Sequence, residues 1–407
     1  MPDEKIGTLV IGGGQAGLVM SHQLKQRGLA HLVLERHRIA ERWRSERWDG
    51  LKFQFPNWSV RLPDFPFPHS DPDGFANTGD IVKFIDDYAA FVAPPIRCGV
   101  AVTRLSQRGG GGFIAETTDG TIAADNVVVA TGPYQRNLVP DLLGDHPVFQ
   151  VHAADYKNPG QLPPGAVLVA GAGASGAQIA EELLQAGRRV YLSVGRHRRL
   201  PRRYRGRDLI WWLAEMRLDQ VTPEERGPAR LGPVISGAYG GRTIDFRSFA
   251  ADGMMLLGRI EAAHDGVLDI ASGLAESMAD GDLVYATFLG AVDEYVRRRK
   301  LDLPEDPDAR TTLPNPPCVT EPLRRLDLAA EGISAVIWAT GYGVDFDWID
   351  LPVTDDKGEA VHRNGISAVP GLYFLGLQWL SKMNSSFLSG VGDDAEVLAD
   401  HILARRL

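Results

Sequence analysis

The sequence GTLVIGGGQAG, residues 7–17, decides the fold class of this chain. It opens with Gly7–Ile11, a short apolar and β-branched run of the kind that forms a buried parallel strand. A helical pattern follows from Leu18 to Arg27, and the next strand, His31–Leu34, ends in Glu35, about 20 residues after the glycines. A strand, a glycine turn, a helix, a strand and a carboxylate in this order predict a unit that binds a dinucleotide.

Each glycine of this turn has its own mechanical role. Gly12 allows the tight turn from strand to helix, Gly14 lets the backbone approach a pyrophosphate, and Gly17 lets the helix pack closely on the strand. The helix N-terminus offers unpaired amides and a partial positive charge to the phosphates. Glu35 would accept a hydrogen bond from a ribose hydroxyl. Because the unit precedes a second copy, we assign it to FAD.

The second copy begins at residue 165. Residues 165–170 repeat the strand, residues 171–176 repeat the turn as GAGASG, and residues 178–185 repeat the helix. Residues 190–194 form the next strand. This internal repeat predicts a second dinucleotide-binding unit.

The second copy lacks the carboxylate. Counting forward from Gly171 as from Gly12 to Glu35 reaches Val194, and Arg196 follows. An acid would repel a 2′-phosphate and an arginine would bind it, so this site is predicted to prefer NADPH to NADH. The arginines expected as neighbours of Arg196 are Arg198, Arg199, Arg202 and Arg203. The alternative is that the basic run is a solvated loop.

The expected fold class is α/β, with two Rossmann-like dinucleotide-binding domains. The FAD-binding domain would comprise residues 1–160 and 330–407. The NADPH-binding domain, residues 161–329, would be inserted into it and would carry a variable insertion at about 200–310. Proline-rich stretches at 159–164 and 314–317 are predicted to be the linkers.

Two Ala-Thr-Gly turns accompany this arrangement. Each follows an apolar run, one at 130–132 and one at 339–341, and we expect both to adjoin the passages between the domains. A further strand at 371–376 leads to a helix that begins near Gly390 and ends at Leu403. Its positive end would face the flavin ring, although a plain cap by Ser389 or Asp393 explains the same residues.

The residues expected to bind the two cofactors lie at these turns and strand ends. They are Gly12, Gly14, Gln15, Ala16, Gly17, Glu35, Arg36, Trp43, Val102, Ala130, Thr131, Gly132, Gly171, Gly173, Ala174, Ser175, Gly176, Ser193, Arg196, Ala339, Thr340, Gly341, Gly390, Val391 and Gly392. In the unassigned insertion we expect Trp211 and Trp212 to pack in the core rather than against a substrate.

Composition restricts the class of protein. The 407 residues fit two domains, and 44% hydrophobic with 23% charged residues is typical of soluble globular chains. The net charge of −9 argues against nucleic-acid binding. Cys98 and Cys318 form no CxxC pair, which argues against a redox dithiol, and no metal site is expected. With neither a leader pattern nor a membrane span, a cytoplasmic protein is expected.

Further motifs carry a resemblance to a known family. Residues 41–44 read ERWR, residues 47–49 read RWD, and residues 63–68 read PDFPFP. With the two glycine loops, these motifs make the chain resemble the flavin-containing monooxygenase superfamily, the class B flavoprotein monooxygenases. Within it, the chain is similar to the bacterial CzcO-type and plant YUCCA proteins.

The resemblance implies an activity. It implies that NADPH reduces FAD, that a C4a-hydroperoxyflavin forms with O2, and that one oxygen atom enters a small amine, sulfide or carbonyl substrate such as a 2-oxo acid. It also places a polar side chain near the flavin, for which Gln54 and Asn57 are both candidate catalytic residues. The family signature is half kept, since His152 and Tyr156 match while His146 and Val148 replace a Phe and a Gly. We expect His152 to brace the domain junction.

Two other functions stay open at this stage. One is an NADPH-dependent flavin reductase or oxidase without oxygen insertion, and the other is a nucleotide-sensing regulator. The substrate, the subclass of oxygenation and the oligomeric state are not predicted, and a homodimer is left open. No membrane partner is expected.

Overall fold

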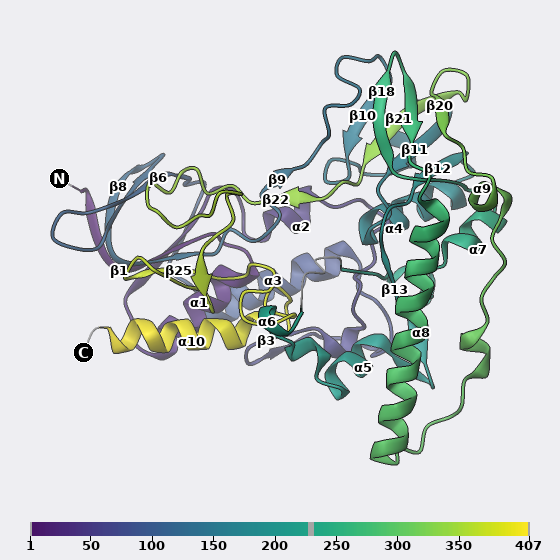
Figure 1. Cartoon of the computed structure of the whole chain (residues 1–407). Helices are drawn as coiled ribbons and strands as arrows, with labels where there is room; N and C mark the ends of the chain where they lie inside the picture. The colour runs from purple at the N-terminus through teal and green to yellow at the C-terminus, as the bar shows by residue number, and fades with distance from the viewer. Residues whose placement is uncertain (1, 227–231, 406–407) are drawn as a thin grey trace.

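The structure is a computed structural model that describes residues 2–226 and 232–405. Two sheets lie in separate halves of the molecule, a mixed sheet in the half that holds the chain termini and a parallel sheet in the other (Figure 1). The predicted α/β class with two dinucleotide-binding units is confirmed.

The first sheet is built on β1 (Glu4–Ile11), the strand that leads into the first glycine turn. Leu9 and Val10 on this strand are fully buried, as the apolar run requires. β1 pairs in parallel with β2 (His31–Glu35) and with β8 (Gly120–Val129). The remaining strands of this sheet are β5 (Ile96–Cys98), β6 (Val102–Gln107), β7 (Phe113–Thr117), β23 (His362–Arg363), β24 (Ile366–Ser367) and β25 (Leu372–Phe374).

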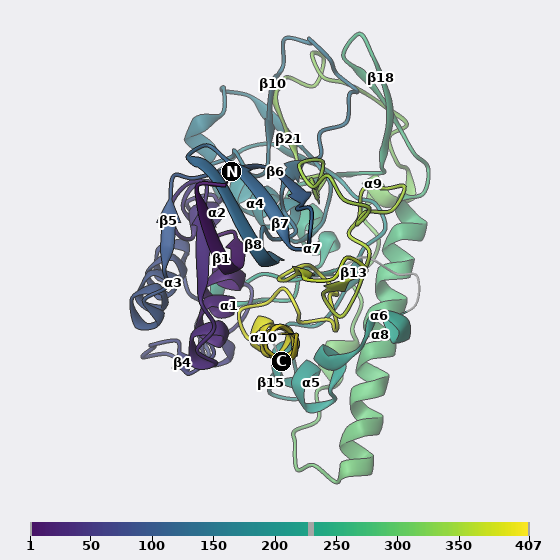
Figure 2. The same ribbon diagram turned by 90° about the vertical axis from the view of Figure 1, so that its left-hand side faces the viewer.

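Three helices cover one face of this sheet. α1 (Gln15–Gln26) packs between α3 (Thr78–Val92) and α10 (Val391–Ala404), as Figure 2 shows from the side of the first half. α3 begins with a capping box, in which the Asn77 side chain accepts from Asp80 N–H and the Asp80 carboxylate accepts from Asn77 N–H. α1 instead begins at Gly14 without a side-chain cap.

The second sheet repeats this plan. Its order is β10 (Phe149–His152), β21 (Ile333–Trp338), β11 (Ala166–Ala170), β12 (Val190–Ser193) and β17 (Met255–Leu257), and all neighbours are parallel. α4 (Ala174–Gln185) follows the second glycine turn and packs on β11 and β12. An antiparallel sheet of β18 (Ile260–His264), β19 (Val267–Ile270) and β20 (Arg325–Asp327) adjoins it.

The segment after β12 adds structure to the second half. α8 (Leu274–Arg299) is a long helix that runs along the outer side of the molecule (Figure 1). α5 (Leu209–Glu215) carries Trp212, whose side chain is fully buried and donates from Nε1 to Tyr204 O at 2.9 Å. The expectation that Trp212 packs in the core is therefore confirmed.

The chain crosses between the halves twice, and the two crossings pair with each other. β9 (Arg136–Asn137) leaves the first Ala-Thr-Gly turn and pairs antiparallel with β22 (Tyr342–Gly343), which follows the second. The expected association of both turns with the passages is confirmed.

The proline-rich stretches are not these crossings. β10, at 149–152, and β21, at 333–338, already belong to the second sheet, although we assigned them to the FAD-binding domain. Pro163 lies inside the second half, where its carbonyl accepts hydrogen bonds from Arg188 Nη2 at 2.6 Å and Ser334 Oγ at 3.1 Å. The linker interpretation was wrong because a rigid, proline-rich segment also serves as an ordinary loop within a domain.

The remaining elements are short. They are α2 (Glu41–Ser45), β3 (Arg61–Leu62), β4 (Phe65–Pro66), β13 (Arg198–Arg199), β14 (Arg203–Tyr204), β15 (Arg207–Asp208), α6 (Pro223–Arg226), β16 (Pro233–Val234), α7 (Phe246–Ala251), α9 (Pro317–Thr320) and 3-10 turns at Asn57–Ser59, Pro159–Gln161, Leu218–Gln220, Ala238–Gly240 and Pro307–Arg310. Within residues 2–226 and 232–405, no helix has the length and apolar character needed to cross a membrane.

Candidate active site

A cavity of about 1070 Å³ is lined by both glycine turns. It therefore lies between the two halves, at the carboxyl ends of the parallel strands, where open α/β sheets bind their ligands. Residues from the first half, the second half and the segment that follows β12 all contribute to its wall.

The first glycine turn leaves room only where a ligand would approach. Gly12 has φ +116°, and a Cβ on it would lie 2.5 Å from Ala130 O. A Cβ on Gly17 would lie 1.8 Å from Gly12 O, so α1 can approach β1 only through a glycine. A Cβ on Gly14 would meet nothing within 4 Å, because Gly14 faces the cavity.

The second turn has the same geometry. Gly171 has φ +108°, and a Cβ on it would lie 2.5 Å from Ala339 O. On Gly176 it would lie 1.9 Å from Gly171 O, and on Gly173 it would meet nothing within 4 Å. The Ala339 carbonyl thus packs against the second turn in the same way as the Ala130 carbonyl packs against the first.

Both helices that follow the turns leave their first amides uncapped. Gly14 and Gly173 are the N-cap residues of α1 and α4, and neither end has a side-chain cap. Open space, uncapped amides and the positive end of a helix suit a pyrophosphate. The two turns thus fit two dinucleotides.

The strand ends beside the turns differ. Glu35, at the end of β2, lines the cavity and accepts from Gly13 N–H at 2.6 Å and from His37 N–H at 2.8 Å. At the end of β12, Ser193 donates to Gly258 O at 3.0 Å, and no carboxylate occupies the equivalent place. Arg196 lines the cavity there, as does Arg259, which the sequence did not reveal because it follows the neighbouring strand β17, far along the chain.

Most of the arginines expected beside Arg196 lie elsewhere. Arg199 is buried and donates to Asp245 at 2.7 Å and Asp282 at 2.9 Å. Arg202 is also buried in an ion pair, and Arg203 donates to backbone carbonyls. Only Arg198 of the four lines the cavity. The expectation was wrong for the other three because tertiary contacts supply their acceptors.

The two candidate catalytic residues are in different places. Gln54 lines the cavity. The Asn57 side chain does not line it and instead donates from Nδ2 to Asp71 O at 2.9 Å, while Asn57 N–H donates to Gly74 O. Asn57 Oδ1 is buried without a protein partner. The cavity therefore favours Gln54.

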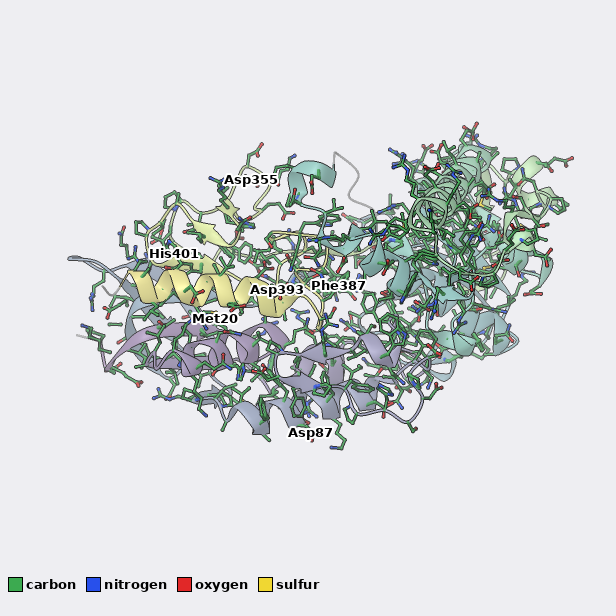
Figure 3. The ribbon with its side chains drawn as sticks, turned by 90° about the horizontal axis from the view of Figure 1, so that it is seen from below. Met20, Asp87, Asp355, Phe387, Asp393 and His401 are labelled. Atoms are coloured by element: carbon green, nitrogen blue, oxygen red, sulfur yellow. The ribbon has the colours of Figure 1, made fainter. Side chains whose placement is uncertain are left out.

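The C-terminal helix approaches the cavity through the segment that precedes it. Gly390, Val391 and Gly392 do not line the cavity, and a Cβ on Gly392 would meet Pro63 Cγ at 2.8 Å. Residues 386–388 line it instead, and Gln15 Nε2 donates to Ser386 O at 2.8 Å. Figure 3 shows Phe387 beyond the Asp393 end of α10, towards the second half.

The structure brings most of the predicted cofactor residues to one cavity. Those that line it are Gly12, Gly14, Gln15, Ala16, Glu35, Arg36, Trp43, Val102, Ala130, Thr131, Gly132, Gly171, Gly173, Ala174, Ser175, Gly176, Ser193, Arg196, Ala339, Thr340 and Gly341. Gly17 packs behind the turn.

His152 braces the crossing between the halves. Its Nδ1 accepts from Ala154 N–H at 3.1 Å, so Nε2 carries the proton and donates to Gly341 O at 3.1 Å. Burial lowers the pKa of His152 and favours this neutral form. The Tyr342 ring packs edge-on against it at 5.0 Å.

One wall of the cavity is apolar and was not predicted. Phe55 and Phe387 pack together at 4.9 Å, and they come from separate segments of the first half. Further apolar lining residues from the rest of the chain are Ile210, Leu213, Val234, Ile235 and Met383. No motif marked this wall, because its members meet only in the tertiary structure.

Comparisons with known proteins agree with this geometry. The family model described as pyridine nucleotide-disulphide oxidoreductase matches residues 9–222. A Geobacillus kaustophilus protein described as an uncharacterized CzcO-like oxidoreductase is 33% identical over 404 residues, with 98% of each chain covered. The probable indole-3-pyruvate monooxygenase YUCCA3 of Arabidopsis thaliana is 29% identical over 194 residues, 44% of each chain.

A solved structure shares the fold. The flavin-containing monooxygenase of Stenotrophomonas maltophilia superposes with a TM-score of 0.66 at 20% identity, covering 99% of this chain and 100% of that one. Fold and site together define a flavoprotein with two dinucleotide-binding units, for FAD and for NADPH. The chain belongs to the pyridine nucleotide-disulphide oxidoreductase family, and the expected relationship to the flavin-containing monooxygenase superfamily is confirmed.

Proposed function

We propose that this chain is an NADPH-dependent monooxygenase that contains FAD and transfers one oxygen atom from O2 to a small organic substrate. The single observation that carries the proposal is that two dinucleotide turns open into one cavity with an apolar wall. Such a cavity brings a flavin, a nicotinamide and a substrate within reach of one another and limits the access of water.

Different residues of the cavity would bind the two cofactors and enclose the substrate. Gly14 and the first amides of α1 would bind the FAD pyrophosphate, and Gly173 and α4 that of NADPH. When bound and reduced, the flavin supplies the activation of O2. Phe55 and Phe387 exclude water from the wall, and the Gln54 amide supplies a hydrogen-bond donor and acceptor beside them.

The preference for NADPH rests on Arg196. Arg196 lies beyond the end of β12 and lines the cavity. The equivalent place in the first half is held by Glu35, a carboxylate that would repel a 2′-phosphate. Arg259 lines the same cavity and would add a second positive charge. We keep the division into an FAD-binding and an NADPH-binding domain as part of this proposal.

The substrate class stays broad. An amine, a sulfide or a carbonyl compound fits the proposal, and the 2-oxo acid named for the YUCCA relative belongs to the last group. The cytoplasmic location and the homodimer stay predictions, which cell fractionation and light scattering test.

Isotope labelling tests the proposal. Purified enzyme with FAD, NADPH and ¹⁸O2 is given methyl phenyl sulfide, N,N-dimethylaniline and phenylpyruvate in separate reactions. We expect one labelled oxygen atom in the product of at least one reaction, with NADPH consumed in proportion to that product. Hydrogen peroxide without a labelled product in all three would contradict oxygen insertion.

The second candidate function is a flavin reductase or oxidase. Reductases of this type usually carry a redox dithiol or use an acceptor protein, and here Cys98 lies at the end of β5 in the first half while Cys318 lies in α9 in the second. The two thiols therefore cannot form one redox pair in this fold. The labelling experiment, repeated with catalase, separates the two functions. Catalase removes the labelled H2O2 that an oxidase would release and that by itself oxidises the sulfide and phenylpyruvate, so only an oxygenase then transfers ¹⁸O to the substrate.

A further inference from the structure

Arg202 forms a buried ion pair beside the cavity. Its Nε and Nη2 donate to the two carboxylate oxygens of Asp208 at 2.9 and 3.1 Å. The side chains are 1% and 8% exposed. Removing two charges from water is unfavourable unless their hydrogen bonds are made, so this pair has little freedom to shift.

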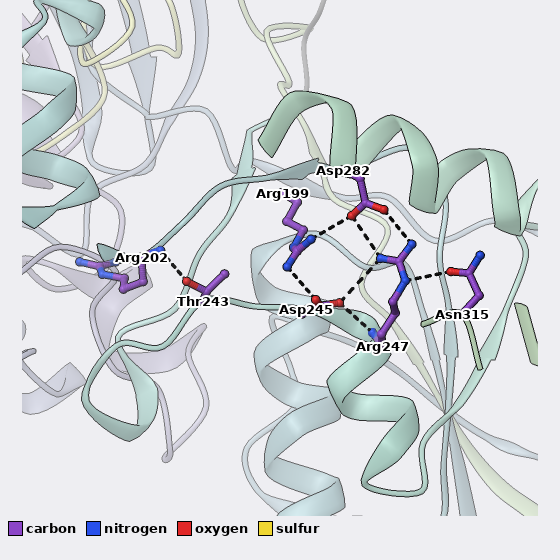
Figure 4. Close-up of polar contacts among 7 residues, drawn as sticks. All are labelled: Arg199, Arg202, Thr243, Asp245, Arg247, Asp282 and Asn315. Carbon is purple, nitrogen blue, oxygen red and sulfur yellow. Dashed lines mark hydrogen bonds and ion pairs between the residues drawn. The ribbon is translucent and has the colours of Figure 1, made fainter. Parts of the chain in front are cut away.

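A third bond of this guanidinium reaches into the first half. Arg202 Nη1 donates to Gln54 O at 2.6 Å, across 148 residues of sequence. Its backbone N–H is held by Thr243 Oγ1 at 2.8 Å, a contact that Figure 4 shows. The guanidinium also lies over the Phe75 ring, 4.5 Å from its centroid. The segment after β12 thus holds the chain at Gln54 through a charged donor.

Two glycines complete the contact. A Cβ on Gly237 would lie 2.0 Å from Phe53 O, and a Cβ on Gly241 would lie 2.5 Å from the Phe75 ring. Phe53 N–H donates to Ala76 O at 2.7 Å, which ties the two segments of the first half together. The chain around Gln54 is therefore clamped against residues 237–241.

We propose that Arg202 is a positioning residue that holds Gln54 and Phe55 in the wall of the cavity. If the Arg202 side chain is lost, the Gln54 carbonyl loses a charge-assisted bond and the loop at 53–55 gains freedom to move away from the cavity. The catalytic consequence is that more of the electrons from NADPH end in hydrogen peroxide instead of in product, and this consequence rests on the proposed function. The effect on the loop itself does not.

A buried ion pair can also be purely structural, and this chain offers a matched control. Arg199, three residues earlier, is also enclosed, with a side chain that is 9% exposed and pairs with Asp245 and Asp282. Figure 4 shows this second cluster, which includes Arg247 and Asn315 and points away from Arg202. The acceptors in this cluster, Asp245, Asp282 and Asn315, all belong to the second half.

Hydrogen exchange measures the loop directly. In the FAD-loaded full chain, we expect Arg202→Met to raise the exchange rate of amides in residues 51–57 about tenfold, the effect of losing one charge-assisted hydrogen bond. Arg199→Met should lower the melting temperature of the protein about as much as Arg202→Met does, but it should leave the exchange rate at 51–57 unchanged. Equal exchange at 51–57 in both variants would overturn the proposal.

A milder variant covers the case in which Arg202→Met does not fold. Asp208 Oδ1 also accepts from Ile210 N–H at 2.9 Å and caps α5. Asp208→Asn keeps an amide oxygen for this cap while it removes the charge that orients Arg202. We expect faster exchange at 51–57 by a smaller factor, and wild-type exchange in this variant would count against the proposal.

A functional readout separates this inference from the proposed activity. The ratio of hydrogen peroxide to NADPH consumed, with methyl phenyl sulfide present, should rise severalfold in Arg202→Met and stay at the wild-type value in Arg199→Met, while Arg202→Lys should lie between. Faster exchange at 51–57 in an enzyme that never oxygenates a substrate would support the positioning role and contradict the proposed function. In an enzyme that does oxygenate its substrate, altered exchange at 51–57 with an unchanged ratio would show that the position of the loop does not matter to the chemistry, and the proposal would fail.

Discussion

At the scale of the residue, one position distinguishes the two dinucleotide sites. Glu35 ends β2 in the first half, whereas the equivalent place after β12 has no acid and is followed by Arg196. Both residues line the cavity. A carboxylate favours an unmodified ribose and a guanidinium favours a 2′-phosphate, so we expect this one residue type to determine which nucleotide each half accepts.

We expect Arg196→Ala to weaken the use of NADPH by about 1–3 kcal/mol in kcat/KM, the range for losing a charge-assisted hydrogen bond, with little effect on NADH. Steady-state rates of flavin reduction with each nucleotide measure this. Arg207→Ala is the control, since Arg207 belongs to the same basic run but does not line the cavity. An unchanged ratio of NADPH to NADH use in Arg196→Ala would contradict the assignment.

At the scale of the element, each glycine turn separates a packing role from a binding role. Gly17 touches Gly12 so closely that any Cβ would collide with a carbonyl, whereas Gly14 faces open space with φ −81°, which any residue adopts. The two positions lie three residues apart on the same helix start. They can therefore be tested separately.

We expect Gly14→Ala to fold with nearly the stability of the wild type and to bind FAD at least about tenfold more weakly, because a methyl group would occupy the place of the pyrophosphate. Gly17→Ala should destabilise the apoprotein by about 3 kcal/mol or more, since α1 must move off β1. Urea unfolding of the apoproteins and flavin titration measure the two effects. Equal FAD affinity in Gly14→Ala and the wild type would contradict the role of this turn.

At the scale of the whole molecule, the two halves are joined by paired crossings that His152 braces. Its two ring nitrogens bond to Ala154 N–H and to Gly341 O, and this pattern is complete only in the neutral imidazole. Because burial lowers its pKa in the folded protein, the unfolded chain binds more protons between that value and about 6.5. The neutral form stabilises the junction above about pH 6.5, and this contribution is lost as the pH falls through the folded pKa.

We therefore expect the free energy of unfolding to fall as the pH is lowered below about 6.5, and to fall less steeply in His152→Gln. Other buried histidines share this trend, among them His31 and His197, whose pKa values burial also lowers. The difference between the two curves isolates His152. Parallel curves for the wild type and His152→Gln from pH 8 to about pH 5 would show that His152 does not titrate on unfolding.

The repeated elements could be predicted because their signals are local. A strand, a glycine turn and a helix depend on residues within a short stretch, and both copies lie where the pattern placed them. The prediction that the proline-rich stretches are the linkers was wrong, because β10 and β21 join the second sheet through pairing partners that are distant in sequence. The proline content of a segment does not indicate which distant strands pair with each other.

The sequence alone determined the α/β class, the two dinucleotide turns and the contrast between Glu35 and Arg196, because each follows from residue types at short, fixed spacings. Only the tertiary structure decided which arginines face the cavity, since Arg199 and Arg202 are bound by acids up to 83 residues away. It also decided that Gln54 lines the cavity while Asn57 does not. These outcomes depend on long-range burial and pairing, in which a side chain's partners are set by the fold and not by its neighbours along the chain.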